Sequence, residues 1–271
     1  MDTKELDQYF TKRGIAKAYA REVSDRWPGD GVLFIEPSAG EGAFLHPLRD
    51  AGRTVKAIDL VPRAPGIERG NFLANHDIFA GKHPTTVVIG NPPFGKNACT
   101  AVRFFNHAAE RADVIAFIVP RTFRKPSLEN RLDPMFHLAE NRDVDDFAFI
   151  LDGRAHDVPC AWQIWTKKPV RREIRIPPPV DHLIAYTNPA HACFAMRRVG
   201  FYAGRVFTTD FRDLRLTTHY FIKEMEAGVM EKLRGVNWTD LAGQTVGARS
   251  LSKAEIAFKL AELYGAKALR P

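Results

Sequence analysis

Cysteine is scarce in this chain, and long apolar runs are missing. The 271 residues include three cysteines, which are widely spaced and form no CxxC pair: Cys99, Cys160 and Cys193. This usage argues against a disulfide framework or a zinc site, so we expect no metal and buried, reduced thiols. The apolar runs are far shorter than the ~20 residues that a membrane span requires, and the polar N-terminus lacks the apolar region of a signal peptide. The composition therefore predicts a soluble, cytoplasmic protein without membrane association.

Two glycine-rich phosphate-binding signatures are also absent. The chain contains neither the GxGxxG pattern of dinucleotide-binding proteins nor the GxxxxGK[ST] phosphate loop. It has no internal repeat and no low-complexity tract, which excludes repeat architectures and fibrous proteins. A nucleotide-like ligand would have to be held by another arrangement.

Acidic residues are outnumbered by basic ones, and the excess is uneven. Lys and Arg total 39 against 32 Asp and Glu, a net charge of +7. Residues 166–225 alone contain eleven basic and five acidic side chains. Pro169 and the run Pro177–Pro179 mark a boundary or a stiff linker. We therefore expect a nearly neutral domain over residues 1–170 and a small basic region over residues 171–271 that could recognise nucleic acid.

Apolar runs alternate with amphipathic segments in the first part of the chain. The runs have the length and composition of buried strands: 32–35, 55–59, 86–89 and 114–119. The segments with helical spacing are 12–27, 43–51 and 100–112. Thr11 is the expected N-cap of the first of these helices. Strands alternating with helices predict an α/β fold with a Rossmann-like, doubly wound, mostly parallel sheet.

The later part of the chain has a different pattern. The expected strand pairs are 147–151 with 160–166, a hairpin around the turn 152–154, and 194–199 with 205–208. Ser252 and Glu255 have the spacing of a capping box before a helix over 256–264, and Gly265 suits the position after its end. The basic region therefore combines strands with at least one helix.

A glycine-bearing turn follows the first buried strand and reads Glu36-Pro37-Ser38-Ala39-Gly40-Glu41-Gly42. Glycines at a strand-to-helix turn let the backbone approach a ligand closely, although the same turn also occurs without a ligand. Asp59 ends the next expected strand, where a carboxylate can accept hydrogen bonds from ribose hydroxyls or simply cap a helix. Together these features suggest a nucleoside-like ligand.

The most specific motif is Asn91-Pro92-Pro93-Phe94, at the end of a later apolar strand. Two consecutive prolines fix the backbone and remove two donors, which leaves the Pro92 carbonyl free to accept. The Asn91 side chain offers a second acceptor, and Phe94 offers a flat face. Two acceptors and an aromatic ring can hold a planar exocyclic amine; the alternative is a rigid turn that ends a strand.

These motifs resemble those of class I S-adenosylmethionine-dependent methyltransferases, in the branch that methylates the N6 amine of adenine in nucleic acid. The sequence 36–42 resembles that family's cofactor loop, and Asn91–Phe94 matches its catalytic motif. Gln8-Tyr9-Phe10-Thr11 resembles its N-terminal motif, with Lys12 where a proline is usual. The order of the three motifs resembles the γ-type DNA adenine methyltransferases, and the resemblance covers residues 7–168.

The resemblance implies S-adenosylmethionine as the cofactor. The residues that it places at the cofactor are Tyr9, Phe10, Thr11, Glu36, Pro37, Ser38, Gly40, Gly42, Asp59, Asp77 and Asn91. Glu36 and Gly40 would lie against the methionine part, and Asp59 would hold the ribose hydroxyls. Asp77 is expected at the adenine amine of the cofactor, with Asn71 as its rival, and Phe79 packs either on the adenine ring or in the core.

The same resemblance implies how the substrate is held. The catalytic residues would be Asn91, Pro92, Pro93 and Phe94, with the target base stacked on Phe94. A second aromatic face would come from the hairpin, where His156 is favoured; Trp162 and Trp165 are the other candidates, although core packing is the expected role of both. The expected substrate-binding residues are Phe94, Lys96, Arg121, Arg124, Lys125 and His156. Aromatic residues within the basic region, such as Phe201 and Tyr202, suit either a nucleic-acid surface or a core.

The sequence is compatible with several functions. Adenine-N6 methylation of DNA is the leading interpretation, and methylation of RNA adenine by the same motif is the alternative. A protein glutamine N5-methyltransferase uses a related motif, although the basic region argues against it. A binding protein that has lost turnover would not need both motifs intact.

Overall fold

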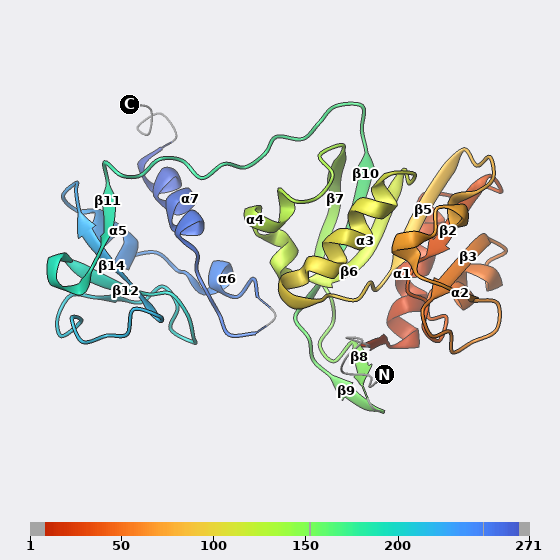
Figure 1. Cartoon of the computed structure of the whole chain (residues 1–271), viewed down its shortest axis with the longest axis horizontal. Helices are drawn as coiled ribbons and strands as arrows, with labels where there is room; N and C mark the ends of the chain where they lie inside the picture. The colour runs from red at the N-terminus through yellow and green to blue at the C-terminus, as the bar shows by residue number, and fades with distance from the viewer. Residues whose placement is uncertain (1–8, 152, 246, 266–271) are drawn as a thin grey trace. The chain divides into compact units, whose positions relative to one another are not determined.

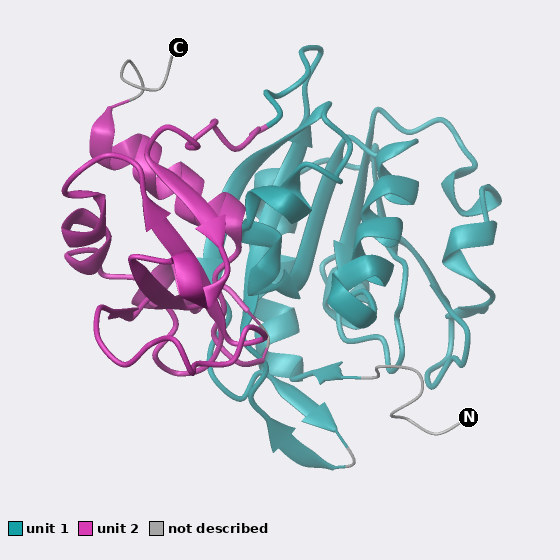
Figure 2. Ribbon diagram, turned by 60° about the vertical axis from the view of Figure 1, so that its left-hand side comes forward, with its two compact units in different colours: residues 1–174 teal, residues 175–271 magenta. Residues whose placement is uncertain are grey.

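The computed structural model describes residues 9–151, 153–245 and 247–265 (Figure 1). The chain forms two compact units, residues 1–174 and 175–271, shown in different colours in Figure 2. The boundary predicted from the prolines, 170/171, lies in the same segment, since residues 168–180 contain no helix or strand.

Unit 1 contains a seven-stranded sheet in the order β4-β3-β2-β5-β6-β10-β7. The strands are β2 (Val32–Glu36), β3 (Thr54–Asp59), β4 (Glu68–Arg69), β5 (Thr85–Gly90), β6 (Val114–Pro120), β7 (Phe136–Asp143) and β10 (Cys160–Lys167). Neighbouring strands from β4 to β6 are parallel, whereas β10 is antiparallel to both β6 and β7. The prediction of a doubly wound, mostly parallel α/β sheet is confirmed. The strand order reverses between β2 and β5, the point where such sheets bind ligands.

Helices cover both faces of this sheet because every central strand is apolar on both sides. The helix α3 (Cys99–Ala109) packs on the face that includes Leu33 and Ile35 of β2. The helices α1 (Arg13–Arg26) and α2 (Leu45–Asp50) pack on the opposite face, with Val32 and Phe34. Alternate residues of one strand therefore belong to two different cores.

A small sheet carries the N-terminal motif. It joins β1 (Phe10–Thr11), β8 (Phe149–Leu151) and β9 (Arg154–His156) in the order β1-β8-β9. The predicted hairpin of 147–151 with 160–166 is therefore wrong: β8 pairs with β1 and β9, while β10 pairs with β6 and β7. Thr11 is also not the helix cap, because it lies in β1 and Lys12 occupies the N-cap position without a side-chain bond. Gln8 and Asp152 lie outside the described residues.

Trp162 and Trp165 belong to the core and not to a substrate face. Both are buried, and Trp162 stacks on Tyr19 of α1 with ring centroids 4.3 Å apart. Phe44, which precedes α2, lies nearly parallel to the same indole at 6.5 Å. The stack therefore joins α1, β10 and the segment before α2. The expected role of both tryptophans, core packing, is confirmed, and neither ring is open to a substrate base.

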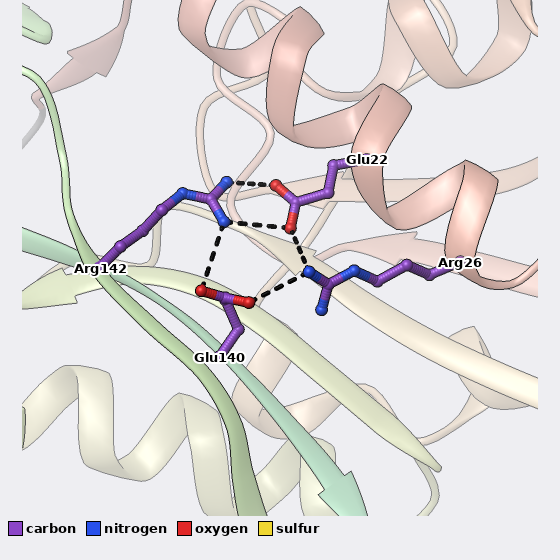
Figure 3. A network of polar contacts seen from close by, with 4 residues as sticks. All are labelled: Glu22, Arg26, Glu140 and Arg142. Atoms are coloured by element: carbon purple, nitrogen blue, oxygen red, sulfur yellow. Dashed lines mark hydrogen bonds and ion pairs between the residues drawn. The ribbon is translucent and has the colours of Figure 1, made fainter.

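A charged network joins α1 to the edge strand β7 (Figure 3). Arg142 of β7 donates from both terminal nitrogens to the carboxylate of Glu22 on α1. The bond from Nη1 to Oε1 is 3.1 Å long, and Nη2 donates to Oε2. Arg26 lies 3.1 Å from Glu22 and 3.1 Å from Glu140, so that each acid contacts two bases. The Arg142 guanidinium also lies 5.2 Å from the centre of the Tyr19 ring. The network fixes α1, which directly follows the N-terminal motif.

Replacing Arg142 with alanine should lower the free energy of unfolding by about 1–2 kcal/mol. Two half-buried carboxylates lose a charge-assisted partner, and solvent screening moderates the cost. Arg21→Ala is the matched control, because its ion pair with Asp25 on the same helix is largely exposed and should cost less than about 0.5 kcal/mol. Urea unfolding of both variants measures this difference. If both variants lost the same free energy of unfolding, the network would stabilise the protein no more than an ordinary surface ion pair does.

Unit 2 contains a four-stranded antiparallel sheet in the order β11-β14-β12-β13. Its elements are β11 (Ile184–Thr187), β12 (Phe194–Arg197), β13 (Val206–Phe207), β14 (His219–Glu224), α5 (Val229–Arg234), α6 (Thr239–Ala242) and α7 (Lys253–Tyr264). The predicted pairing of 194–199 with 205–208 is confirmed by β12 and β13, and Ser252 and Glu255 form the predicted capping box. One face of the sheet packs on the helices, and the other packs on Phe211.

The cysteines differ in burial. All three cysteines are free, but only Cys160 is buried, whereas Cys99 is half-buried and Cys193 is exposed. The expectation of buried thiols is therefore wrong for two of them. Among the described residues, no helix has the length and apolar character that crossing a membrane requires.

Candidate functional site

A cavity of about 770 Å³ opens at the carboxyl ends of β2, β3 and β5. It lies at the point where the strand order reverses, between β2 and β5. Its walls come from the N-terminal motif 9–11, the loop 36–44, the segment 70–73 and the turn 91–95. Its size is that of a pocket for a drug-sized ligand or cofactor. The structure thus brings together the three motifs that the sequence singled out.

Glu36 lies at the base of the loop that follows β2 and is almost completely buried. Its Oε1 atom accepts a hydrogen bond from the Phe44 amide at 3.2 Å, and its Oε2 atom accepts one from the Leu45 amide at 2.7 Å. Burial raises the pKa of this carboxyl to about 8; the two amides lower it, and nearby Asp59 raises it further. Glu36 therefore ionises fully at neutral pH only if a positive group joins it.

Asp59 shapes the same loop from the end of β3. Its Oδ2 atom accepts a hydrogen bond from the Gly40 amide at 2.8 Å, and its Oδ1 atom accepts one from the Val61 amide at 2.8 Å. Gly40 has a φ of +50°, and a Cβ there would lie 2.9 Å from the Phe10 ring. A glycine is required at this position because of both the dihedral angle and the close approach. Each Asp59 oxygen keeps a lone pair for a ligand hydroxyl.

Asn91 is held from two sides and leaves one acceptor unused. Its Nδ2 atom donates to the Tyr9 carbonyl at 2.8 Å, and the Ser38 hydroxyl donates to its main-chain carbonyl at 3.0 Å. The Asn91 Oδ1 atom is buried and has no hydrogen-bond partner. Within the described residues, no hydrogen bond reaches the Pro92 carbonyl either. A buried acceptor without a donor is costly, so this corner is suited to a ligand N–H.

Two further features of the wall point to a ligand. The Thr11 Oγ1 atom is also buried without a partner, in the strand that borders the cavity. The Tyr9 ring lies nearly parallel to Phe94, with an interplanar angle of 19° and centroids 6.4 Å apart. A site that combines unpaired polar atoms with aromatic faces is suited to a ligand with a flat, polar ring.

The cavity includes most of the predicted cofactor residues but not all. Tyr9, Phe10, Thr11, Glu36, Pro37, Ser38, Gly40, Gly42, Asp59 and Asn91 all line it, as do Pro92, Pro93 and Phe94. Asp77 is exposed in the 3₁₀ turn η2 (Asp77–Phe79) and does not line the cavity, whereas its rival Asn71 does. Phe79 is buried among the residues of the α3 face. Of the two residues predicted for the adenine-amine position, only Asn71 borders the cavity.

The predicted substrate cations do not line the cavity. Arg121 and Arg124 both pair with Asp143, at 3.1 and 2.6 Å, so that one carboxylate offsets part of their charge. Lys96, Lys125 and His156 also lie outside the set of lining residues. His156 instead packs edge-on against Tyr9, with centroids 6.4 Å apart. None of these five residues therefore borders the cavity, and their contacts with a substrate outside it stay a prediction.

Other basic residues, which the sequence reasoning missed, border the cavity instead. Arg13 and Lys17 lie one turn apart on α1, and Arg103 lies on α3. None of the three forms an ion pair with a described residue, although Glu41 and Asp50 also border the cavity. The i,i+4 spacing of Arg13 and Lys17, directly after the N-terminal motif, is the signal that could have identified them.

One described group has the composition of a metal site, although the sequence predicts none. The Nδ1 atoms of His76 and His107 each lie 3.6 Å from a carboxylate oxygen of Glu110. His107 packs edge-on against Phe72, which lines the cavity, with centroids 4.8 Å apart. The group joins α3 to the segment that carries Asn71, and it does not itself line the cavity.

The chain matches no family model and no curated protein sequence. It is similar to the solved structure of a candidate RNA methyltransferase from Pyrococcus horikoshii, with 16% identity, a TM-score of 0.46, and coverage of 60% of this chain and 87% of that one. The methyltransferase subunit of a type I restriction-modification system from Streptococcus thermophilus has 15% identity and a TM-score of 0.44, over 60% of this chain and 45% of that one.

A third similar structure is the modification subunit of a candidate type I restriction enzyme from Vibrio vulnificus, with 16% identity and a TM-score of 0.42. The similarity covers 59% of this chain and 44% of that one. The chain thus spans less than half of either restriction-modification protein.

Proposed function

We propose that this protein transfers a methyl group from S-adenosylmethionine to the exocyclic N6 amine of adenine in DNA. The observation that carries the proposal is the Asn91 corner: a buried Oδ1 atom without a partner, fixed through Nδ2 and adjacent in the chain to the Pro92 carbonyl. Two such acceptors match the two N–H groups of an exocyclic amine.

The residues of the cavity fit the proposed cofactor. Glu36 would hold its ammonium group, and the free lone pairs of Asp59 would accept its ribose hydroxyls. The Asn71 side chain accepts from the Leu73 amide at 3.1 Å and lies on the wall where the adenine amine of the cofactor would bind. S-adenosylmethionine supplies an electrophilic methyl group on a positively charged sulfur.

The Asn91 corner would prepare the nucleophile. An aromatic amine is a weak nucleophile because its lone pair is delocalised into the ring. When Asn91 Oδ1 and the Pro92 carbonyl accept both N–H groups, the nitrogen is drawn toward tetrahedral geometry and its lone pair is directed at the methyl group. One N–C bond then forms, the S–C bond breaks, and the surplus proton on nitrogen passes to water.

The aromatic pair would hold the target base. Phe94 would stack on one face of the adenine, as the sequence predicted. Tyr9 would supply the second aromatic face instead of His156, because its ring lies nearly parallel to Phe94 and its carbonyl accepts a hydrogen bond from Asn91. In a duplex the base must first be flipped out, at a cost of a few kcal/mol that stacking partly offsets.

Methyl transfer from labelled S-adenosylmethionine tests this proposal. The acceptors are duplex DNA, single-stranded DNA, total RNA and total protein. The nucleic acids are digested to nucleosides and the protein to peptides for mass spectrometry. The expected result is N6-methyladenine in DNA. N6-methyladenine in RNA alone would keep the chemistry and replace the substrate, and label in protein glutamine would replace both. Cofactor binding without label in any acceptor would contradict the proposal.

A further inference from the structure

Unit 2 exposes two neighbouring aromatic side chains at the tip of one turn. Phe201 is 72% exposed and Tyr202 is 59% exposed, and both lie between β12 and β13. Their rings meet edge to face, with centroids 5.1 Å apart and an interplanar angle of 87°. Adjacent large aromatic residues on the surface are costly to leave in water, so such a pair suggests contact with a partner.

The turn that carries the two rings is rigid. The Gly200 amide donates to the Arg249 carbonyl and the Gly204 amide donates to the Arg197 carbonyl, both at 2.8 Å. Val199 pairs with Ser250 in an isolated β-bridge. At Gly204 the φ is +100°, and a Cβ would lie 2.3 Å from the buried Trp238 ring. The aromatic tip is therefore built on a fixed base packed against the core, which lowers the entropy lost on binding.

Arginine side chains surround the two rings. The Arg249 guanidinium lies 4.9 Å from the centre of the Phe201 ring, and that of Arg205 lies 5.9 Å from the Tyr202 ring. Arg197 donates from Nε to the Val199 carbonyl at 3.0 Å. Within the part of unit 2 that the structure describes, none of these arginines has an ion-pair partner, in contrast to Arg121 and Arg124 of unit 1. Their positive charge is available to an anion.

We propose that residues 199–205, together with Arg249, form a binding site for an unpaired stretch of nucleic acid. Bases would stack on Phe201 and Tyr202, and the guanidinium groups would contact the flanking phosphates. Stacking needs an exposed ring face and an unpaired base, so the aromatic pair favours single-stranded segments over intact duplex. The choice of nucleic acid as partner rests on the proposed function, but binding here requires neither the cofactor nor the Asn91 corner.

Fluorescence anisotropy with the full chain and a labelled 20-nucleotide single strand, in the absence of S-adenosylmethionine, tests this site. Replacing both Phe201 and Tyr202 with alanine should weaken binding roughly ten- to hundredfold. Met225→Ala is the matched control, because Met225 is 52% exposed but lies beyond the opposite end of β14 from Arg197. The six-residue strand places it on the order of 20 Å away, and binding should not change.

Arginine 249 gives a second, independent readout. Arg249→Gln should reduce the slope of log affinity against log salt concentration by about 0.7, the value for one phosphate contact on a single strand. Unchanged affinity in the double aromatic variant, or no binding by the wild type, would overturn the site. Tighter binding to duplex than to single strand would overturn the preference for unpaired bases.

The two proposals fail in different ways. If the wild type methylates adenine but the double variant binds the single strand normally, this binding site is ruled out and the proposed function stands. If the wild type binds through the turn but methylates nothing, the binding site stands and the proposed function is ruled out. A surface that instead binds protein would show no salt-dependent affinity for the oligonucleotide.

Discussion

Replacing Asn91 with alanine should lower the rate of methyl transfer by about 10²–10³-fold, the effect of removing one preorganised hydrogen-bonding group from a reacting centre. The variant loses the buried Oδ1 acceptor that would hold one N–H of the amine. It keeps the Pro92 carbonyl and the stacking face of Phe94. Although Asn91 also borders the cofactor cavity, Glu36 and Asp59 would hold the charged and polar groups of S-adenosylmethionine. The affinity for the cofactor should therefore stay within a few-fold of the wild type while the rate falls. Single-turnover kinetics and calorimetry measure the two quantities separately.

Asn91→Asp separates catalysis from structure. Aspartate keeps an acceptor for the amine but cannot donate to the Tyr9 carbonyl, the bond that fixes the asparagine side chain at 2.8 Å. Its rate should lie between those of the wild type and Asn91→Ala. Full activity in the alanine variant would mean that the amine is held elsewhere. Loss of cofactor binding together with a large fall in thermal stability would mean that Asn91 is a structural residue.

The motifs could be recognised from sequence because each is local. The loop 36–42 and the turn 91–94 directly follow apolar strands, and the carboxyl ends of parallel strands meet at one edge of a sheet. Their meeting in one cavity therefore follows from the alternation of strands and helices alone. The orphaned Oδ1 atom of Asn91 does not, because it depends on Tyr9, which is distant in the chain.

One strand that the sequence did not reveal accounts for the wrong hairpin. β7 is an edge strand with mostly partly exposed residues, Phe136–Asp143, so it lacks the apolar run by which the other strands were recognised. Without it, the run 147–151 became the expected partner of β10. The same strand ends in Asp143, which pairs with Arg121 and Arg124. A polar edge strand thus changed the predicted strand pairing and placed an acid beside two of the predicted substrate cations.

The sequence named both Asn71 and Asp77 as candidates but could not decide which of them borders the cavity. Asn71 and Asp77 are six residues apart, and both are polar residues at the start of 3₁₀ turns. Only the packing of Phe72 against the α3 face places the first of them on the cavity wall. Arg103, likewise, reaches the cavity because of where α3 begins.

Binding of S-adenosylmethionine should strengthen by nearly tenfold between pH 6 and pH 7. The pKa of Glu36 is raised to about 8 by burial, so the carboxyl is mostly protonated over this range in the free protein. An ammonium group beside it favours the ionised form, and binding must then release about one proton. Glu36→Gln should remove the pH dependence over this interval and bind more weakly than the wild type at pH 7.5.

Calorimetry in buffers of different ionisation enthalpy counts the released proton directly. The unliganded protein provides an internal check, because the folded state holds the Glu36 proton more tightly than the unfolded state does. From about pH 4.5, the ordinary pKa of a glutamate, to about pH 8 the contribution of Glu36 to stability should therefore fall as the pH rises. Glu36→Gln should flatten that part of the profile. If cofactor binding released no proton in the wild type while the stability profile still changed in the variant, Glu36 would be a buried acid that shapes the loop, and the ammonium group would be held by another residue.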